Sequence, residues 1–170
     1  MAPTLQTPRI RLTPHRPSDL DEMTGLLGDP AVVGPIGVPP STREQCWHRL
    51  LRYMGHWTVA GYGHWVVRDL DGVFLGEVGL MDSRRVTAPM FEGTPEAGWV
   101  FATAAQGRGF AGEACAAMLA WADEHGLPRT VCIIGPDNAP SLRLAERLGY
   151  ARWAEGTYIE RPTVMLERYA

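Results

Sequence analysis

The chain has 170 residues, of which 45% are hydrophobic and 21% charged, and these proportions are ordinary for a globular protein of one domain. Nineteen acidic against sixteen basic residues give a net charge of −3, which argues against a nucleic-acid-binding surface. No apolar run is long enough to span a bilayer, and the N-terminal residues lack the order of a signal peptide. Cys46, Cys115 and Cys132 have neither CxxC nor metal-ligand spacing, so we expect a reducing, cytoplasmic compartment and no metal site.

The first part of the chain predicts one strand and two helices. Residues 9–13 alternate apolar and polar side chains, which is typical of a half-buried strand. The following helix carries apolar residues at helical spacing, namely Leu20, Met23, Leu26 and Leu27. Residues 29–41 are rich in Pro and Gly, so we expect an irregular surface connection there. Ser41 or Thr42 then caps a second helix that continues to about Trp57. The apolar face of this second helix includes Cys46, Leu50 and Met54.

The rest of the chain predicts a hairpin followed by alternating strands and helices. The predicted elements are strands at 63–70 and 73–81 around an Asp71-Gly72 turn, a strand at 97–101, a helix at 109–125, a strand at 130–134, a helix at 138–148, and strands near 150–155 and 162–167. The order β-α-α-β-β-β-α-β-α-β-β indicates an α/β (α+β) fold. We expect a mixed, mostly antiparallel sheet of six to seven strands, flanked by helices, with one right-handed parallel β-α-β crossover.

A glycine-rich segment lies between the predicted strand 97–101 and the helix that follows it. Gly107, Gly109 and Gly112 let the backbone turn tightly and approach a ligand closely. The first turn of the helix presents unpaired N–H groups and the positive end of the helix dipole, a combination that binds phosphate. Arg108 adds a charge. The alternative is that these glycines only close a turn.

Residues 107–112 also spell GxGxxG, the fingerprint of dinucleotide-binding proteins. In that fold the first glycine follows its strand almost directly, whereas residues 102–106 intervene here. The dinucleotide fold also needs further strand–helix–strand units, and the upstream region predicts a hairpin instead. Dinucleotide binding is therefore the weaker interpretation.

Several segments together resemble one enzyme family. Gln106 to Ala111 matches the Q/R-x-x-G-x-G/A pyrophosphate signature of the GNAT superfamily of acyl-CoA-dependent N-acetyltransferases, and residues 95–101 resemble that family's fourth strand. Residues 138–141 and 147–150 resemble its N-x-x-S…K/R-L-G-F segment. Residues 7–12 are similar to the start of the Rim-type branch, which includes ribosomal-protein N-terminal acetyltransferases.

The resemblance implies a GNAT-like acetyltransferase domain spanning residues 1–170, with acetyl-CoA as co-substrate. The backbone of residues 108–112 would hold the pyrophosphate, and the main chain of residues 99–101 would pair with the pantetheine arm. The side chains of Trp99 and Phe101 are candidates for the core instead. The implied cofactor-binding residues are Trp99, Val100, Phe101, Gln106, Gly107, Arg108, Gly109, Phe110, Ala111, Gly112, Asn138 and Ser141.

Two further roles follow from the same resemblance. Asn138 would bind the cofactor arm, or cap a helix ahead of Pro140, or do both. Many family members have a tyrosine seven residues after this asparagine, where this chain has Ala145. The Rim-type branch has a serine at Ser141, which implies that Ser141 protonates the departing thiolate. We expect a small effect from its loss, because a thiol pKa of about 8.5 makes CoA a fair leaving group.

An amine must be neutral to attack a thioester, so a general base is expected within hydrogen-bond reach. The resemblance makes Glu96, at the head of the strand 97–101, the first candidate, because the family's fourth strand often carries an acidic residue there; a solvated carboxylate at a strand end is its alternative. Glu77 lies between apolar neighbours and could face either side of the sheet. His64 has a suitable intrinsic pKa, with a structural role as the alternative.

The sequence as a whole predicts an N-acetyltransferase that moves an acetyl group from acetyl-CoA to a primary amine in a ternary complex. Cys115 and Cys132 fall in apolar patterns and are expected to be core residues rather than acyl carriers. The resemblance implies that the acceptor, a small-molecule amine or a protein N-terminus, is selected by residues 29–41 and 83–95. Arg84 in the second of these loops, with its neighbour Arg85, is a candidate for attracting an acidic acceptor.

We expect no nucleic-acid or membrane partner, and an exposed strand edge would permit a homodimer. A non-catalytic acyl-CoA-binding sensor is the alternative function, followed by a dinucleotide-binding domain.

Overall fold

The computed structural model describes residues 2–170, and its centre is a single eight-stranded sheet of order β1-β2-β3-β4-β5-β6-β8-β7. Neighbouring strands are antiparallel except for β5 and β6, which are parallel. The strands are β1 (Leu5–Gln6), β2 (Ile10–Pro14), β3 (His64–Asp69), β4 (Phe74–Met81), β5 (Glu96–Phe101), β6 (Arg129–Ile134), β7 (Ala151–Tyr158) and β8 (Arg161–Tyr169).

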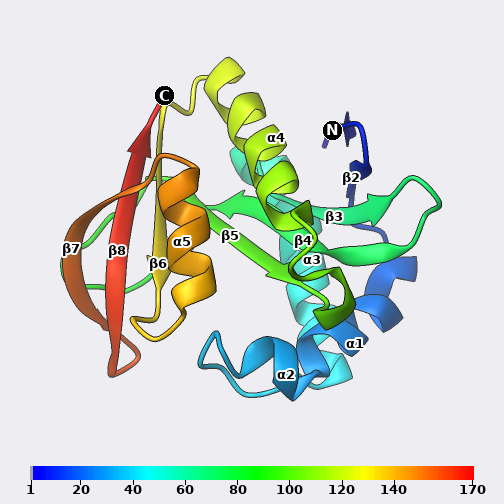
Figure 1. Ribbon diagram of the computed structural model, residues 1–170, viewed down its shortest axis with the longest axis horizontal. Helices are drawn as coiled ribbons and strands as arrows, with labels where there is room; N and C mark the ends of the chain where they lie inside the picture. The colour runs from blue at the N-terminus through cyan, green and yellow to red at the C-terminus, as the bar shows by residue number, and fades with distance from the viewer. Residues whose placement is uncertain (1) are drawn as a thin grey trace.

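Helices cover both faces of this sheet. The helices are η1 (Pro17–Asp19), α1 (Leu20–Gly28), α2 (Pro30–Val33), α3 (Arg43–Ala60), η2 (Thr103–Ala105), α4 (Phe110–Glu124) and α5 (Ala139–Arg147). Figure 1 shows α4 and α5 in front of the sheet and α3 behind it. Within residues 2–170, no helix has the length and apolar character needed to cross a membrane.

The fold class predicted from the sequence is confirmed. The expected mixed, mostly antiparallel sheet contains one parallel pair, and α4 provides the crossover between its strands. The sheet has more strands than the six to seven expected, partly because the short β1 pairs with β2, Leu5 opposite Leu12 and Gln6 opposite Arg11. Two residues are too short a run for an alternating pattern to reveal.

Two local expectations were wrong. The segment 29–41 is not wholly irregular, because Asp29 accepts a hydrogen bond from the Ala31 N–H and so begins the short helix α2. On α3, Met54 lies on the exposed side, and Tyr53 occupies the buried position after Leu50. Thr42, one of the two predicted caps, does begin α3 and forms a reciprocal capping box with Gln45.

The alternation of side chains along the central strands separates two apolar layers. On the α4 face, Trp65, Val78 and Ala97 join the core that contains Met118. The residues that alternate with Trp65, Val78 and Ala97 along these strands face α1 and α3. On this face His64, Gly79 and Gly98 lie opposite one another across β3, β4 and β5. Val66, Glu77 and Val100 form the next row, and Met81 pairs with Glu96. The candidate bases named by the sequence therefore share one face of the sheet.

The parallel strands β5 and β6 separate almost as soon as they meet. Glu96 opposite Val131 is their one paired position among the described residues. Beyond it the strands diverge, as Figure 1 shows, and the middle residues of β5 (Gly98, Trp99 and Val100) are only half-buried. A central strand thus presents backbone groups that no neighbouring strand satisfies.

Two glycine substitutions test this packing. A Cβ at Gly79 would lie 2.5 Å from Cδ2 of His64, whereas Gly55 on the exposed side of α3 has nothing within 4 Å. We expect Gly79→Ala to destabilise the protein by about 1–3 kcal/mol through overpacking. Gly55→Ala, the matched control, should stabilise it by about 0.5–1 kcal/mol through helix propensity. Urea unfolding measures both; equal effects of the two substitutions would contradict the packing described.

Candidate active site

The glycine-rich turn leads from η2 into α4. Gly107 and Gly109 both have left-handed backbone angles, with φ of 71° and 81°, and Gly109 is the N-cap of α4. The side-chain amide of Gln106 donates a hydrogen bond to the Phe101 carbonyl at 3.0 Å. This hydrogen bond joins the turn to the C-terminal end of β5, in the region where β5 and β6 are separated.

A second anchor joins the turn to the N-terminal segment. Glu113, in the first turn of α4, accepts hydrogen bonds from the Thr7 hydroxyl at 2.5 Å and from the Arg9 guanidinium at 2.6 Å. The same guanidinium donates to the Arg108 carbonyl at 3.0 Å. Burial raises the pKa of Glu113, but the hydrogen bonds from Thr7 and Arg9 outweigh it and hold that pKa below its ordinary value.

Positive charge gathers at this helix terminus. The guanidinium groups of Arg9 and Arg108 each lie 4.8 Å from the centre of the Phe110 ring, in cation–π contact. Both side chains belong to exposed residues. Together with the free N–H groups of the first turn of α4, they form a surface suited to an anionic group. The sequence predicted Arg108 here, but not Arg9, which is 99 residues away along the chain.

Asn138 performs the capping role that the sequence allowed. Its side-chain oxygen accepts a hydrogen bond from the Ser141 N–H at 3.2 Å, and Pro140 lies in the first turn of α5. The Asn138 amide nitrogen is not used by this cap. Because Ser141 lies in the first turn of α5, its hydroxyl sits at the end of that helix that follows β6.

Glu96 is buried and paired with a loop arginine. Its carboxylate accepts a hydrogen bond from Nε of Arg85 at 2.7 Å, and the Arg85 guanidinium lies 4.5 Å from the centre of the Tyr158 ring. The expected alternative of a solvated carboxylate is therefore wrong, since Glu96 is 7% exposed. Arg84, the neighbour of Arg85, pairs with Asp82 and Glu92. Both arginines predicted to attract an acidic acceptor are thus paired with carboxylates of this chain.

Glu77 forms a second buried pair, with a histidine the sequence did not single out. Nε2 of His15 lies 3.2 Å from a Glu77 carboxylate oxygen, and Nδ1 of His15 lies 3.3 Å from the His64 carbonyl. A carbonyl only accepts, so Nδ1 carries a proton. The contact with Glu77 then requires one further proton, held on Nε2 or on the carboxylate. Glu77 and His15 therefore share a proton in a site closed to solvent.

The ring of His64 completes this cluster beneath α3. It stacks on the Tyr53 ring, with centroids 4.1 Å apart and an angle of 5° between the planes. Spacing could have identified Tyr53, because it follows Cys46 and Leu50 at helical intervals. His15 offered a weaker signal, since it lies two residues after Thr13, on the same side of β2.

The cysteines are unsuited to carrying an acyl group. Cys115 and Cys132 are buried in the core under α4. Burial raises the pKa of both thiols well above its ordinary value, so both are protonated at neutral pH.

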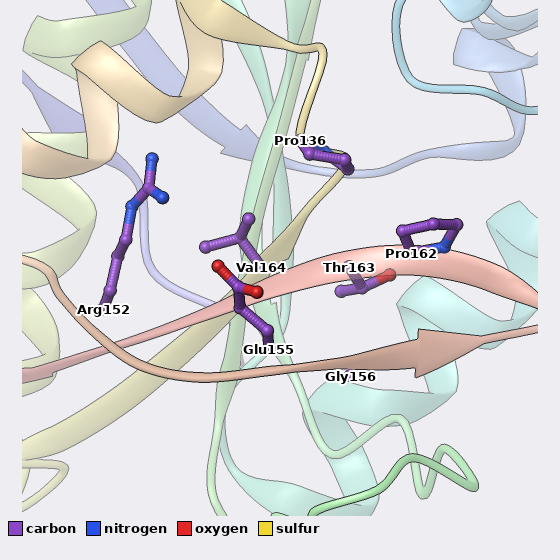
Figure 2. A pocket seen from close by; sticks show the side chains of 7 residues that line it. All are labelled: Pro136, Arg152, Glu155, Gly156, Pro162, Thr163 and Val164. Carbon is purple, nitrogen blue, oxygen red and sulfur yellow. The ribbon is translucent and has the colours of Figure 1, made fainter.

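One pocket is lined by residues of β7, of β8 and of the segments that flank these strands and follow β6, and not by the predicted site residues described above. It has a volume of about 190 Å³ and is lined by Pro136, Arg152, Glu155, Gly156, Pro162, Thr163 and Val164. Figure 2 shows Arg152 and Glu155 projecting from β7, with Thr163 on β8 beyond them. None of the site residues predicted from the sequence lines it.

Comparison with known proteins identifies the family to which the chain belongs. The model of the family described as the acetyltransferase (GNAT) domain matches residues 9–151. The chain belongs to the GNAT acetyltransferase family. It is 30% identical over 153 residues to the uncharacterized protein YkkB of Bacillus subtilis (strain 168), covering 85% of this chain and 83% of that protein. A protein from Bordetella pertussis, described as a GNAT-family acetyltransferase, is 35% identical, with a TM-score of 0.86 over 98% of this chain and 99% of its own.

More distant GNAT enzymes share the fold. Ribosomal-protein-S5-alanine acetyltransferase from Vibrio fischeri has a TM-score of 0.79 at 16% identity, over 99% of this chain and 97% of its own. Spermidine N-acetyltransferase from Vibrio cholerae, solved with CoA and spermine, has a TM-score of 0.73 at 17% identity, over 96% of each chain. The expected GNAT membership is confirmed, and Rim-type enzymes are among the structural neighbours.

The hydrogen bonds that Glu113 accepts from Thr7 and Arg9 predict that its contribution to the free energy of unfolding depends on pH. Glu113→Gln should destabilise the protein by about 1–2 kcal/mol at pH 7, because the hydrogen bonds from Thr7 and Arg9 lose a charged acceptor. The folded-state pKa of Glu113 is lowered, so its contribution is complete above the unfolded value near 4.3 and disappears as the pH falls through the folded value.

Unfolding in urea at pH 7 and at about pH 3 measures this difference. Glu124→Gln, on the exposed end of α4, is the matched control and should change stability little at either pH. A Glu113→Gln effect that is as large at the lower pH as at pH 7 would contradict the assignment.

Proposed function

We propose that this protein transfers an acetyl group from acetyl-CoA directly to a primary amine. The observation that carries the proposal is the early separation of β5 and β6 directly beside the glycine-rich turn of α4. The separated strands offer backbone groups to an arm that contains amides, and the turn offers N–H groups and positive charge to a pyrophosphate.

The proposed donor site uses the residues implied by the family signature. The backbone of residues 108–112 holds the pyrophosphate, with the guanidinium of Arg9 as an additional charge. The main chain of Trp99, Val100 and Phe101 pairs with the pantetheine arm, and the free amide nitrogen of Asn138 binds that arm from α5. Two observations support this: residues 98–100 are half-buried, and a structural neighbour of the same fold was solved with CoA.

The proposed acyl transfer is direct. The amine nitrogen attacks the thioester carbonyl, and the sulfur leaves as a thiolate close to the Ser141 hydroxyl, which protonates it. Burial of Cys115 and Cys132 with raised thiol pKa values supports a path without an acyl-enzyme. Glu96 and Glu77, the carboxylates expected on the amine side of the site, lie on the face of the sheet that α1 and α3 cover, and their proposed role is to position that side through their pairs with Arg85 and His15.

The proposed acceptor is a small amine or a protein N-terminus. Structural neighbours named for a ribosomal protein and for spermidine represent both classes. The segments 34–42 and 82–95 carry exposed apolar residues that would meet an acceptor, namely Ile36, Val38, Val86 and Met90.

Turnover tests the proposed function. The protein is incubated with acetyl-CoA and a panel containing spermidine, free amino acids and short peptides with free N-termini. We expect CoA release, followed with a thiol reagent, together with one acetylated amine detected by mass spectrometry. Binding of acetyl-CoA without turnover of any amine would instead support a sensor. A stable acetylated form of the enzyme would contradict direct transfer.

Ser141→Ala should lower kcat by less than about tenfold. CoA leaves readily even as a thiolate, so the hydroxyl assists a step that is already favourable. Initial rates at saturating acetyl-CoA measure the effect. Ser18→Ala, an exposed serine of η1, is the control. A loss of more than about a thousandfold would show that Ser141 does more than protonate the thiolate.

A further inference from the structure

The imidazole of His64 lies flat on the sheet and extends toward the separation of β5 and β6. A Cβ at Gly79 on β4 would be 2.5 Å from Cδ2 of the ring, so only glycine leaves room beneath it. A Cβ at Gly98 on β5 would be 3.7 Å from Cε1 and 4.0 Å from Nε2. The ring therefore spans from β3 across β4, and its tip lies over Gly98, a half-buried residue of β5.

The structure holds this ring in place without using its nitrogens. Tyr53 covers the face of the ring away from the sheet, and the His64 carbonyl accepts hydrogen bonds from Trp57 and His15. His64 is 8% exposed, yet its Nδ1 has no hydrogen-bond partner in the described part of the chain. A buried polar group without a partner is uncommon in folded proteins and commonly marks a functional position.

The two carboxylates on the same face are already engaged. Glu96 accepts from the Arg85 guanidinium, and Glu77 shares a proton with His15. Protonation of Glu96 would leave the Arg85 guanidinium without its counter-charge, which is unfavourable, and Glu77 is already occupied by the proton that it shares with His15. The ring of His64 has no such partner to lose.

We propose that His64 accepts the proton released by the amine nitrogen as it attacks the thioester, with Nε2 at the ring tip as the accepting atom. This assignment rests on the proposed acetyl transfer. In the proposed site, Tyr53, Gly79 and Gly98 position the ring. The Glu77–His15 pair fixes the backbone of His64 through the His15 Nδ1–H. The Glu96–Arg85 pair holds the loop 82–95 in place.

The step balances as follows in atoms and charge. The amine loses its first proton to solvent before it attacks. The C–N bond forms, the nitrogen becomes positively charged, and Nε2 of His64 takes one proton from it, directly or through one water molecule. The C–S bond then breaks and the sulfur leaves with the electron pair. The thiolate is protonated at Ser141, solvent restores the serine hydroxyl, and His64 returns its proton to solvent.

The surroundings of the ring keep it neutral, and only a neutral ring can accept a proton, although they also make it a weaker base than an ordinary imidazole. Burial, followed by the charge of His15 and the arginines of α3, places the pKa of His64 well below its ordinary value, so the ring is neutral at physiological pH. The titratable and charged groups on the elements packed around it are His15 directly after β2, Arg49, Arg52, Tyr53 and His56 from α3, Glu77 from β4 and Glu96 from β5.

The test compares His64→Gln with wild type and with His48→Gln, an exposed histidine of α3. The acceptor is the panel amine with the highest wild-type kcat/KM. We expect His64→Gln to lower kcat roughly 100-fold or more, as loss of a proton acceptor does. The KM for acetyl-CoA and the CoA-induced rise in Tm should be unchanged, and His48→Gln should behave as wild type.

The pH profile separates a proton acceptor from a structural histidine. Wild-type kcat should fall only at a pH well below 6.5, because the pKa of His64 is lowered from that ordinary value and only the neutral ring accepts a proton, and His64→Gln should lack this acid limb. A variant within about threefold of wild type, or one that keeps the acid limb, overturns the proposal. If His64→Gln does not fold, His64→Asn replaces it, and absence of an acid limb in wild type alone also overturns the proposal.

The result also separates this assignment from the proposed function. Wild-type protein that acetylates no amine in the panel refutes the acetyl transfer, and the role of His64 with it. Wild-type protein that acetylates an amine, with an unimpaired His64→Gln variant that still binds CoA, refutes the role of His64 alone.

Discussion

The separation of two parallel strands is the constraint on which the rest of the structure depends. β5 and β6 pair at Glu96 and Val131 and then diverge, so the centre of the sheet contains backbone that no other strand completes. Such an opening is unfavourable unless something else binds there or water reaches it. The chain surrounds it with elements that each contribute one chemical property: a glycine-rich turn with positive charge, a helix with a free serine hydroxyl, and a row of titratable side chains on the opposite face.

Buried charge on that face is compensated in pairs. The Glu77 and Glu96 side chains are both buried, the first hydrogen-bonded to His15 and the second paired with Arg85, and removing either partner would leave a buried acidic group without compensation. The first pair joins segments that are distant in the chain, His15 directly after β2 and Glu77 on β4, and the second joins the loop 82–95 to the strand β5 that follows it. The glycines at 79 and 98 have a complementary function. They remove side chains from the sheet surface, so that a flat aromatic ring can occupy it between two layers.

Much of the fold could be predicted from sequence because its signals are local. The Asp71-Gly72 turn marks the hairpin of β3 and β4, and the apolar run at 130–134 marks a buried strand. The glycine-rich turn and the order of elements indicated the family. The partners of the acidic side chains could not be predicted, since His15 is 62 residues from Glu77 and the strand register decides which face each occupies. The choice between Tyr53 and Met54 depends on one residue of helix phase, about 100° of rotation.

Acetyl-CoA binding at the opening between β5 and β6 is the central claim, and thermal unfolding tests it most directly. Tm is measured with acetyl-CoA, with free CoA, and with NADH as the dinucleotide control. Ligand at about 100 times its Kd adds about 2.7 kcal/mol to the free energy of unfolding. For a chain of this size the rise in Tm is roughly 5–11 °C. The account predicts that rise with both CoA species and none with NADH. No rise with either CoA species, or an equal rise with NADH, would contradict it.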